Sequence, residues 1–310
     1  MIKKCIGCGI GLQDINKKLY GYTPSIDNDY CERCFKITNY NEKIDTGAVK
    51  DNYSLINKVN KKGSFVIFLI DYLNIYDEVI NLYKSINNKK VLVITKSDII
   101  PKNIVKKKLI SNIKKVYNID ENIIYVSAKS GENLGSINRL IEKEGETFIL
   151  GFTNTGKSSL INKLTNSKIT VSKNANTTLD FIKVESEFGT IIDAPGFIGR
   201  SFLDSLTPKN IIKPLVYQLE SKYYLHFLDI DISSNVDNNL TIYLNNEIKI
   251  SKRREMKACT TKIKILKNTD LIIKGLGFIN IKKECILSIN GDAQVFEKRA
   301  SIVGGNNESY

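Results

Sequence analysis

Short uninterrupted apolar runs, each followed by a polar stretch, recur between residues 91 and 192. The runs at residues 91–94, 123–126, 147–150 and 190–192 are typical of buried strands in a mainly parallel sheet. Beyond residue 206 the pattern changes to alternating apolar and polar positions, with turn residues at 245–246 and 290–291. We therefore predict an α/β region followed by a β-rich region.

The run at residues 147–150 leads into a complete phosphate-loop pattern, G-x-x-x-x-G-K-[ST], at residues 151–158, with a helix-like segment after it. A polyphosphate needs inward-pointing backbone N–H groups, and a glycine-rich turn lets the main chain wrap that closely. Lys157 is expected to reach the β- and γ-phosphates and Ser158 to bind magnesium. The alternative for this pattern alone is a turn before a core helix. The residues expected to contact nucleotide here are Gly151, Thr153, Asn154, Thr155, Gly156, Lys157, Ser158 and Ser159.

Two motifs upstream predict a base-binding site. The run at 91–94 ends in Thr95, Lys96, Ser97 and Asp98, which is the guanine-recognition pattern N-K-x-D with threonine in the first place. The Asp98 carboxylate can accept two hydrogen bonds from guanine that adenine cannot offer, while the Lys96 stem packs on the ring. The run at 123–126 ends in a short base-contacting loop made of Ser127, Ala128 and Lys129. Open α/β sheets bind ligands at the carboxyl ends of their strands, where all these motifs lie.

Two further motifs complete the expected catalytic set. Residues 193–196 have the D-x-x-G form of a magnesium and γ-phosphate sensor, in which Asp193 contacts the metal through water. The polar stretch at residues 172–180 is typical of a switch loop, with Thr178 as the candidate magnesium ligand and Thr177 as the alternative register. The candidate catalytic residues are Lys157, Thr178, Asp193 and Gly196, and the candidate magnesium ligands are Ser158, Thr178 and Asp193.

These signatures occur in rotated order. Conventional GTPases place the phosphate loop first and the base-binding loops last, whereas here the base-binding loops precede the phosphate loop. The chain is thus predicted to be a circularly permuted P-loop GTPase, a rearrangement that preserves a packed sheet because domain termini often lie close together. The permutation opens the conventional chain order just after the second switch, so this switch leads directly into the C-terminal segment. We therefore hypothesise a nucleotide-controlled clamp in which switch movement pulls on the C-terminal segment.

The N-terminus carries two C-x-x-C pairs, Cys5 with Cys8 and Cys31 with Cys34, separated by 22 residues. Two such knuckles can close a tetrahedral four-sulfur zinc site, which would be structural because it leaves no position for water. A disulfide or redox pair is the alternative, but no signal peptide precedes the cysteines. Cys259 and Cys285 lie among β-type residues and are expected to be buried thiols.

Together these motifs resemble the YqeH-type circularly permuted GTPases of ribosome biogenesis. Supporting stretches are residues 31–35, 40–42, 151–158, 177–180, 193–196 and 213–219. The resemblance covers essentially the whole chain and implies a zinc finger, a permuted GTPase domain and a β-rich C-terminal domain, which act together in small-subunit assembly. Two departures stand out. Thr95 replaces the usual asparagine, which predicts weaker tethering of the guanine loop, and Asn176 stands where the family typically has glycine.

The position of the usual water-orienting glutamine is occupied by Phe197 and Ile198. The resemblance therefore extends to GTPases with a hydrophobic substitution there, in which potassium can replace the arginine finger. Asn154 is the candidate potassium ligand, with a plain turn residue as the alternative. Slow turnover in sodium and faster turnover in potassium would follow.

Composition agrees with a cytoplasmic, RNA-associated protein. The chain has 46 Lys+Arg against 33 Asp+Glu, a formal charge of +13, which favours ribosomal RNA or a ribosomal subunit as partner. No apolar run is long enough to span a membrane. We predict a zinc finger at residues 1–45, a GTPase domain at 46–206 and a β-rich RNA- or partner-binding domain at 207–310. The expected cofactors are GTP or GDP, magnesium and zinc, with potassium as a candidate; the alternative function is a GTP-gated RNA-binding scaffold with negligible hydrolysis.

Overall fold

The computed structural model describes residue 3 and residues 12–15, 22–32, 52–165, 181–197, 208–256 and 258–303. Contacts between backbone atoms divide the chain into two units, residues 1–50 with 176–180, and residues 51–175 with 181–310. The predicted domain boundary near residue 206 lies inside the second unit. Among the described residues, no helix is both long and apolar enough to cross a membrane.

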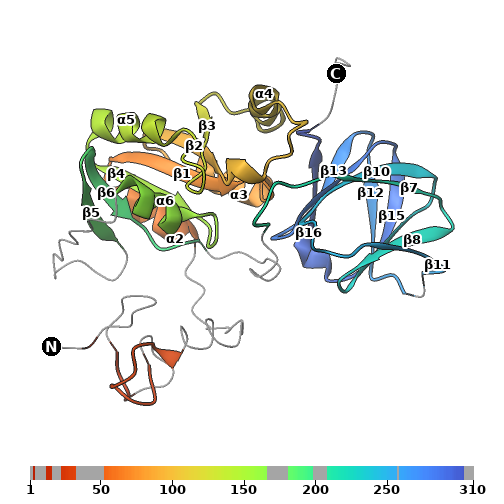
Figure 1. The fold of residues 1–310 in the computed structure, drawn as a ribbon, viewed down its shortest axis with the longest axis horizontal. Helices are drawn as coiled ribbons and strands as arrows, with labels where there is room; N and C mark the ends of the chain where they lie inside the picture. Colours follow the sequence, from red (N-terminus) through yellow and green to blue (C-terminus); the bar gives the residue numbers. More distant parts are fainter. Residues whose placement is uncertain are drawn as a thin grey trace. The chain divides into compact units, whose positions relative to one another are not determined.

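The first half of the second unit is a six-stranded sheet with helices on both faces (Figure 1). Its strands are β1 Phe65–Asp71, β2 Lys90–Thr95, β3 Ile123–Tyr125, β4 Thr147–Gly151, β5 Ile182–Ser186 and β6 Gly189–Asp193. Its helices are α2 Asn52–Asn60, α3 Asp77–Lys84, α4 Lys106–Tyr117, α5 Leu134–Glu144 and α6 Lys157–Leu164, with a 3-10 turn, η1, at Ser97–Ile99. The strand order is β3-β2-β1-β4-β6-β5, and every neighbouring pair is parallel except the β5–β6 hairpin.

The two faces of this sheet are covered by different helices because buried side chains alternate along the strands. Alternate residues of β1 (Val66, Phe68 and Ile70) pack with α2, α3 and α4, whereas Phe65, Ile67 and Leu69 pack with α5 and α6. All seven residues of β1 are buried. Strand β1 was not among the predicted runs, although it is the central strand beside both β2 and β4.

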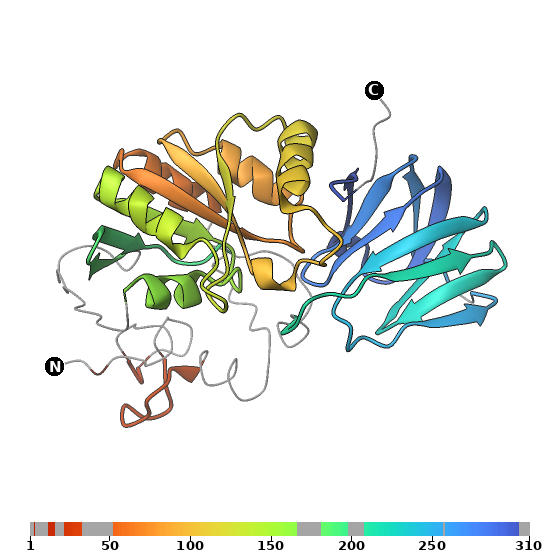
Figure 2. The ribbon, with the colours of Figure 1, turned by 45° about the horizontal axis from the view of Figure 1, so that its top comes forward.

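The second half of the unit contains two five-stranded antiparallel sheets that face each other across one apolar core (Figure 2). One has the order β16-β13-β14-β10-β7 and the other β11-β8-β9-β15-β12, which confirms the predicted β-rich region. The strands of the first sheet are β7 Leu215–Leu219, β10 Asn238–Tyr243, β13 Thr269–Ile273, β14 Gly277–Ile281 and β16 Phe296–Ala300. The strands of the second are β8 Tyr223–Phe227, β9 Ile230–Ser234, β11 Ser251–Arg254, β12 Thr261–Ile265 and β15 Cys285–Asn290, and a 3-10 turn, η3, spans Ala293–Val295.

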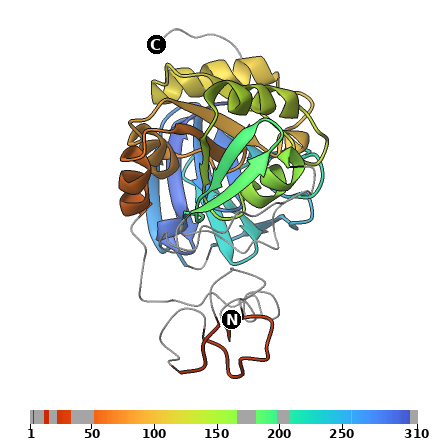
Figure 3. The same cartoon turned by 90° about the vertical axis from the view of Figure 1, so that its left-hand side faces the viewer.

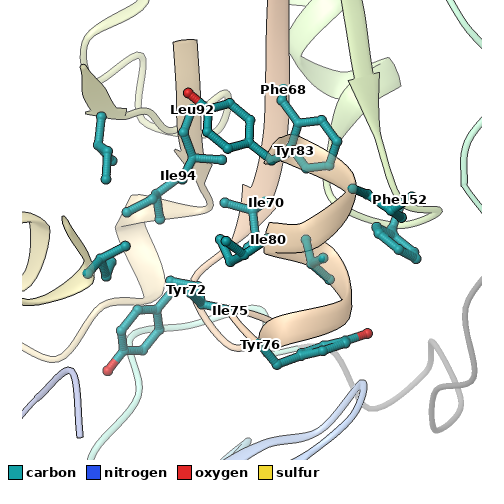
Figure 4. Close-up of a cluster of buried hydrophobic side chains, with 14 of the residues drawn as sticks. Phe68, Ile70, Tyr72, Ile75, Tyr76, Ile80, Tyr83, Leu92, Ile94 and Phe152 are labelled. Carbon is teal, nitrogen blue, oxygen red and sulfur yellow. The ribbon is translucent and has the colours of Figure 1, made fainter. Parts of the chain in front are cut away.

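The two halves of the unit share one hydrophobic core. Tyr72, which follows β1, lies edge-on to Phe278 of β14, with ring centroids 5.8 Å apart, and Tyr243 of β10 stacks on the same Phe278 at 4.7 Å. Figure 4 shows Tyr72 and Tyr76 at one end of the buried cluster that also contains Phe68, Ile70 and Leu92. Because these rings are buried, the α/β and β-rich parts of the second unit are expected to unfold together.

A buried polar network lies beside these aromatic rings. Asp270 and Arg299, from the paired strands β13 and β16, form an ion pair at 3.2 Å with both side chains almost completely buried. Arg299 also donates to the carbonyl of Ile75, and Asn280 donates to Asp270 at 2.8 Å. The network thus attaches the β-rich part to the loop that follows β1.

Candidate nucleotide-binding site

The phosphate-loop pattern lies at the end of β4, whose neighbours in the sheet are β1 and β6. Figure 3 views this sheet from the side of the β5–β6 hairpin. Asn154 and Gly156 have left-handed backbone conformations, with φ of 64° and 90°, and α6 begins at Lys157. The turn is closed by Thr155, whose hydroxyl donates to the Phe152 carbonyl at 2.8 Å. The loop therefore ends at a helix N-terminus, which favours an anion.

Gly151 is needed because β1 passes very close. A Cβ atom built there would lie 2.9 Å from the Leu69 carbonyl oxygen and 2.8 Å from the Thr155 hydroxyl. The D-x-x-G segment approaches from the other side, since a Cβ on Gly196 would lie 3.1 Å from the Thr153 side chain. Thr153 N–H also donates to the Phe197 carbonyl at 3.0 Å. The predicted phosphate loop and second switch are thus in direct contact.

Two predicted catalytic residues meet at this junction. The ammonium of Lys157 forms an ion pair with the carboxylate of Asp193, which ends β6. Ser158 occupies the next helical position and is exposed, as is Ser159. An ammonium, a carboxylate and a hydroxyl lie beside the glycine turn, and this donor set fits a polyphosphate with its magnesium ion.

A tether between the base and phosphate loops is retained despite the unusual threonine. Thr95 ends β2, and its hydroxyl lies 2.5 Å from the carbonyl oxygen of Thr155 and 3.3 Å from that of Ile70. Thr95 is buried, and its backbone pairs with Asp71 on the adjacent strand. The substitution predicted weaker tethering, but the structure shows that the shorter threonine side chain still reaches the carbonyl of Thr155 in the phosphate loop.

The predicted base-binding residues line one cavity of about 420 Å³. Its walls include Thr95, Lys96, Asp98, Ala128, Lys129, Gly156 and Ser159. Ser127 is fully buried just beneath, and its hydroxyl donates to the Asp98 carboxylate at 2.6 Å. The hydrogen bond from Ser127 orients the carboxylate, whose remaining acceptor capacity can take a donor pair such as that of guanine.

Two acidic residues of this site were missed by the sequence analysis. Asp71, at the end of β1, lies 3.5 Å from the Lys96 ammonium and accepts hydrogen bonds from Leu73 N–H and the Asn74 side chain. Its signal was available, because it is a carboxylate directly after an apolar run, as Asp193 is. The other is Glu132, which has no comparable sequence signal.

Glu132 connects the two base-binding loops. Its carboxylate accepts a hydrogen bond from the Ser97 hydroxyl. The Lys106 ammonium donates to both carboxylate oxygens, at 2.6 Å and 2.7 Å. Burial raises the pKa of Glu132, but the hydrogen bonds from Lys106 and Ser97 outweigh it and leave the pKa below the ordinary 4.5. The carboxylate is therefore charged at neutral pH and stabilises both loops.

Phe197 explains why no glutamine-like side chain follows the second switch. It is 1% exposed and packs on Phe68 and Phe152, with ring centroids 5.7 Å and 5.5 Å away. Its backbone meanwhile pairs with the phosphate loop through Gly151 and Thr153. Phe197 therefore has a packing role and cannot orient a water molecule.

Several predicted residues lie outside the described part of the chain, namely Cys5, Cys8, Cys34, Thr177 and Thr178. Cys31 is described and buried, next to Leu12 and Tyr30. Among the described residues no cluster of three or more metal-ligating side chains occurs. The prediction for the other two cysteines was half wrong, because Cys285 is buried in β15 whereas Cys259 is exposed in the turn before β12.

One sheet thus contains base-binding loops, phosphate loop and D-x-x-G segment, in a chain order that places the base-binding loops first. The fold and site define a circularly permuted P-loop GTPase. Comparison with known proteins leads to the same class. The family model described as RsgA GTPase matches residues 65–202, and the model described as 50S ribosome-binding GTPase matches residues 146–265. The chain is a GTPase, and its sequence is similar to the YqeH and RsgA proteins.

Among individual proteins, the chain is homologous to YqeH of Bacillus subtilis, with 27% identity over 89% of this chain and 92% of that protein. It is 30% identical to the GTP-binding protein MJ1464 of Methanocaldococcus jannaschii over 36% of this chain and 31% of that protein. Among solved structures, YjeQ from Thermotoga maritima has a TM-score of 0.33 and 21% identity, covering 43% of this chain and 48% of that one. The GDP-bound structure of TM YlqF has a TM-score of 0.31 and 19% identity, and the match covers 48% of this chain and 60% of that one.

Proposed function

We propose that this GTPase binds GTP in the cavity beside Thr95 and Asp98 and acts as a nucleotide-dependent switch in the cytoplasm, in assembly of the small ribosomal subunit. The observation that carries the proposal is the junction of Lys157 with Asp193 beside a base pocket tied to the phosphate loop by Thr95. Hydrolysis breaks the bond between the γ-phosphorus and its bridging oxygen, which leaves with GDP. The oxygen of a water molecule bonds to the phosphorus in its place, and the proton that this water loses is taken up by the released phosphate or by solvent.

Each predicted side chain has a defined task in this proposal. Lys157 leaves Asp193 and pairs with the β- and γ-phosphate oxygens, while the loop N–H groups hold the remaining charge. Asp98 selects guanine, and Ser127 keeps its carboxylate in place. Bound magnesium neutralises phosphate charge, and Ser158, Asp193 and Thr178 would hold it.

The ribosomal partner is supported by charge as well as by resemblance. Tyr223 of β8 is surrounded by cations, since the Lys252 ammonium lies 4.4 Å from its ring centroid and the Arg254 guanidinium 5.3 Å. Lys252, Arg253 and Arg254 are all exposed on the edge strand β11. An aromatic ring among exposed cations suits a single-stranded RNA segment, which offers phosphates and stacking bases.

Hydrolysis is tested by comparing turnover in potassium and in sodium buffer, alone and with small subunits, large subunits or free ribosomal RNA. Lys157→Ala should abolish turnover, while Lys163→Ala, an exposed lysine on the same helix, should leave it unchanged. Stimulation by small subunits supports the assembly role, and stimulation by large subunits alone contradicts it. Asn154→Gly tests the potassium proposal, because glycine keeps the left-handed backbone at this position (φ 64°) and removes the side chain, so it should remove only the potassium-dependent part.

RNA binding is tested by the salt dependence of ribosomal RNA affinity. The double variant Lys252→Ala/Arg254→Ala should weaken binding and flatten its salt dependence. Lys262→Ala/Lys264→Ala removes two charges from β12, the opposite edge of the same sheet, and serves as the control. Equal losses in both variants would mean that total charge, not the surface around Tyr223, determines binding.

The second candidate function is a GTP-gated RNA-binding scaffold with negligible hydrolysis. The burial of Phe197 at the water-orienting position favours it. Tight, nucleotide-dependent RNA binding without turnover in any of the conditions above would establish this alternative.

We also propose that Cys5, Cys8, Cys31 and Cys34 bind one structural zinc ion. The purified chain should contain one zinc per molecule, and Cys31→Ser should lower that content, whereas Cys259→Ser, at an exposed cysteine far along the chain, should not. Wild-type protein free of zinc after purification in its presence would rule the site out.

A further inference from the structure

The described residues just before β7, 208–214, are called here the connector, and they begin beside the base pocket. Pro208, which is buried, and Lys209 line the same cavity as Asp98 and Lys129. No sequence motif indicates this placement, because residues 208–209 are more than 75 positions away from either base-binding loop.

The connector is attached to the base-binding loops at two points. Lys129 donates a hydrogen bond from its ammonium to the Lys209 carbonyl at 2.5 Å. Ile212 N–H donates to the carbonyl of Ile99 at 2.9 Å, one residue beyond Asp98, and the Ile212 side chain is 2% exposed in the shared core. Both loops that flank the base therefore contact the connector directly.

The other end of the connector is held by the β-rich part. The side-chain amide of Asn246, in the loop after β10, accepts from Lys213 N–H at 2.9 Å and donates to the Lys213 carbonyl at 2.8 Å. Strand β7 then begins at Leu215 and pairs with β10. Between Lys209 and Leu215 the chain is thus held at three places, which leaves little slack.

From this geometry we propose that the connector forms the outer wall of the guanine pocket and couples occupancy of the base, rather than of the γ-phosphate, to the attachment of the β-rich part. The inference rests on the proposed guanine site and deepens it by adding Pro208 and Lys209 as positioning residues. GDP and GTP carry the same base, so both nucleotides stabilise the connector equally. Coupling is reciprocal, so loosening the connector weakens the binding of both nucleotides. The factor is the same for GDP and GTP because their base is the same.

The test uses the full chain and measures dissociation of a fluorescent GDP and of a fluorescent, non-hydrolysable GTP analogue by stopped flow. Pro208→Gly removes the ring from the wall, and Asn246→Ala removes the two side-chain hydrogen bonds to Lys213 without touching the pocket. Each should speed release of both nucleotides by the same factor, about fivefold or more. Asn239→Ala, at an exposed asparagine on β10, is the matched control and should behave as wild type.

The outcomes separate this inference from the proposed function. Wild-type protein that fails to bind either nucleotide overturns the guanine site itself. Wild-type rates in both variants overturn the connector's role, and an effect of Pro208→Gly alone overturns the coupling to the β-rich part. A change confined to the GTP analogue would assign the coupling to the γ-phosphate switch instead. Independently of any variant, GDP should slow hydrogen exchange of the Ile212 amide, and unchanged exchange would contradict the proposal.

Discussion

Replacing Thr95 by valine tests the tether between the base and phosphate loops, because valine keeps the shape of threonine and removes only the hydroxyl. Thr95 is 4% exposed, and its hydroxyl lies nearer to the Thr155 carbonyl, at 2.5 Å, than to that of Ile70, at 3.3 Å. The single proton of the hydroxyl therefore serves Thr155. In the variant, this buried acceptor loses its partner.

The Thr95→Val substitution should mainly lower the affinity for nucleotide. The Thr155 carbonyl and the Gly156 N–H belong to one rigid peptide plane, so a carbonyl that turns toward water also turns an N–H of the phosphate loop. An unsatisfied buried acceptor costs about 1–3 kcal/mol. If about 1.4 kcal/mol of this is lost from binding, the Kd rises about tenfold. The loss of affinity should be equal for GDP and GTP, because the hydrogen bond between Thr95 and Thr155 is not one of the γ-phosphate contacts.

The assay is equilibrium titration with fluorescent GDP and a GTP analogue, together with the melting temperature of the nucleotide-free protein. Thr165→Val is the matched control, since Thr165 is also buried and donates to a backbone carbonyl, that of Ile161 at 3.0 Å, at the far end of α6. Unchanged affinity in Thr95→Val, or an equal loss in Thr165→Val, would refute the reasoning.

Three further predictions follow from packing and charge. Gly151→Ala places a Cβ against the backbone of Leu69 and should cost about 1–3 kcal/mol of stability and most nucleotide binding, measured by urea unfolding and titration; a fully active, equally stable variant would show that β1 can move. Arg299→Met leaves the buried Asp270 carboxylate without its cation and should lower the free energy of unfolding by about 3 kcal/mol or more. Adding Asp270→Asn in a double variant should restore part of this loss, whereas losses that simply add would contradict an ion pair. Glu132 has a lowered pKa, so its stabilisation is present above pH 4.5 and is lost as the pH falls through the folded-state pKa; the difference in melting temperature between wild type and Glu132→Gln should shrink below pH 4.5, and a constant difference would exclude this linkage.

The hydrophobic pattern predicted four strands of the first sheet, each within one or two residues of its observed end. This worked because a strand buried on both faces needs apolar residues at successive positions. The predicted runs at 91–94 and 147–150 correspond to β2 Lys90–Thr95 and β4 Thr147–Gly151. The sequence analysis passed over β1, although its pattern is equally clear.

The local chemistry of the phosphate loop can also be read from the sequence alone, because the glycines at 151 and 156 and the adjoining lysine meet backbone requirements that lie within eight residues. Which distant groups complete the site depends on how the chain folds. Thr95 meets a carbonyl 60 positions away, and Pro208 lines a pocket whose other walls lie far earlier in the chain. Such partners are set by the order of strands in the sheet and by the core that Tyr72 shares with Phe278, and neither leaves a periodic or short-range signal in the sequence.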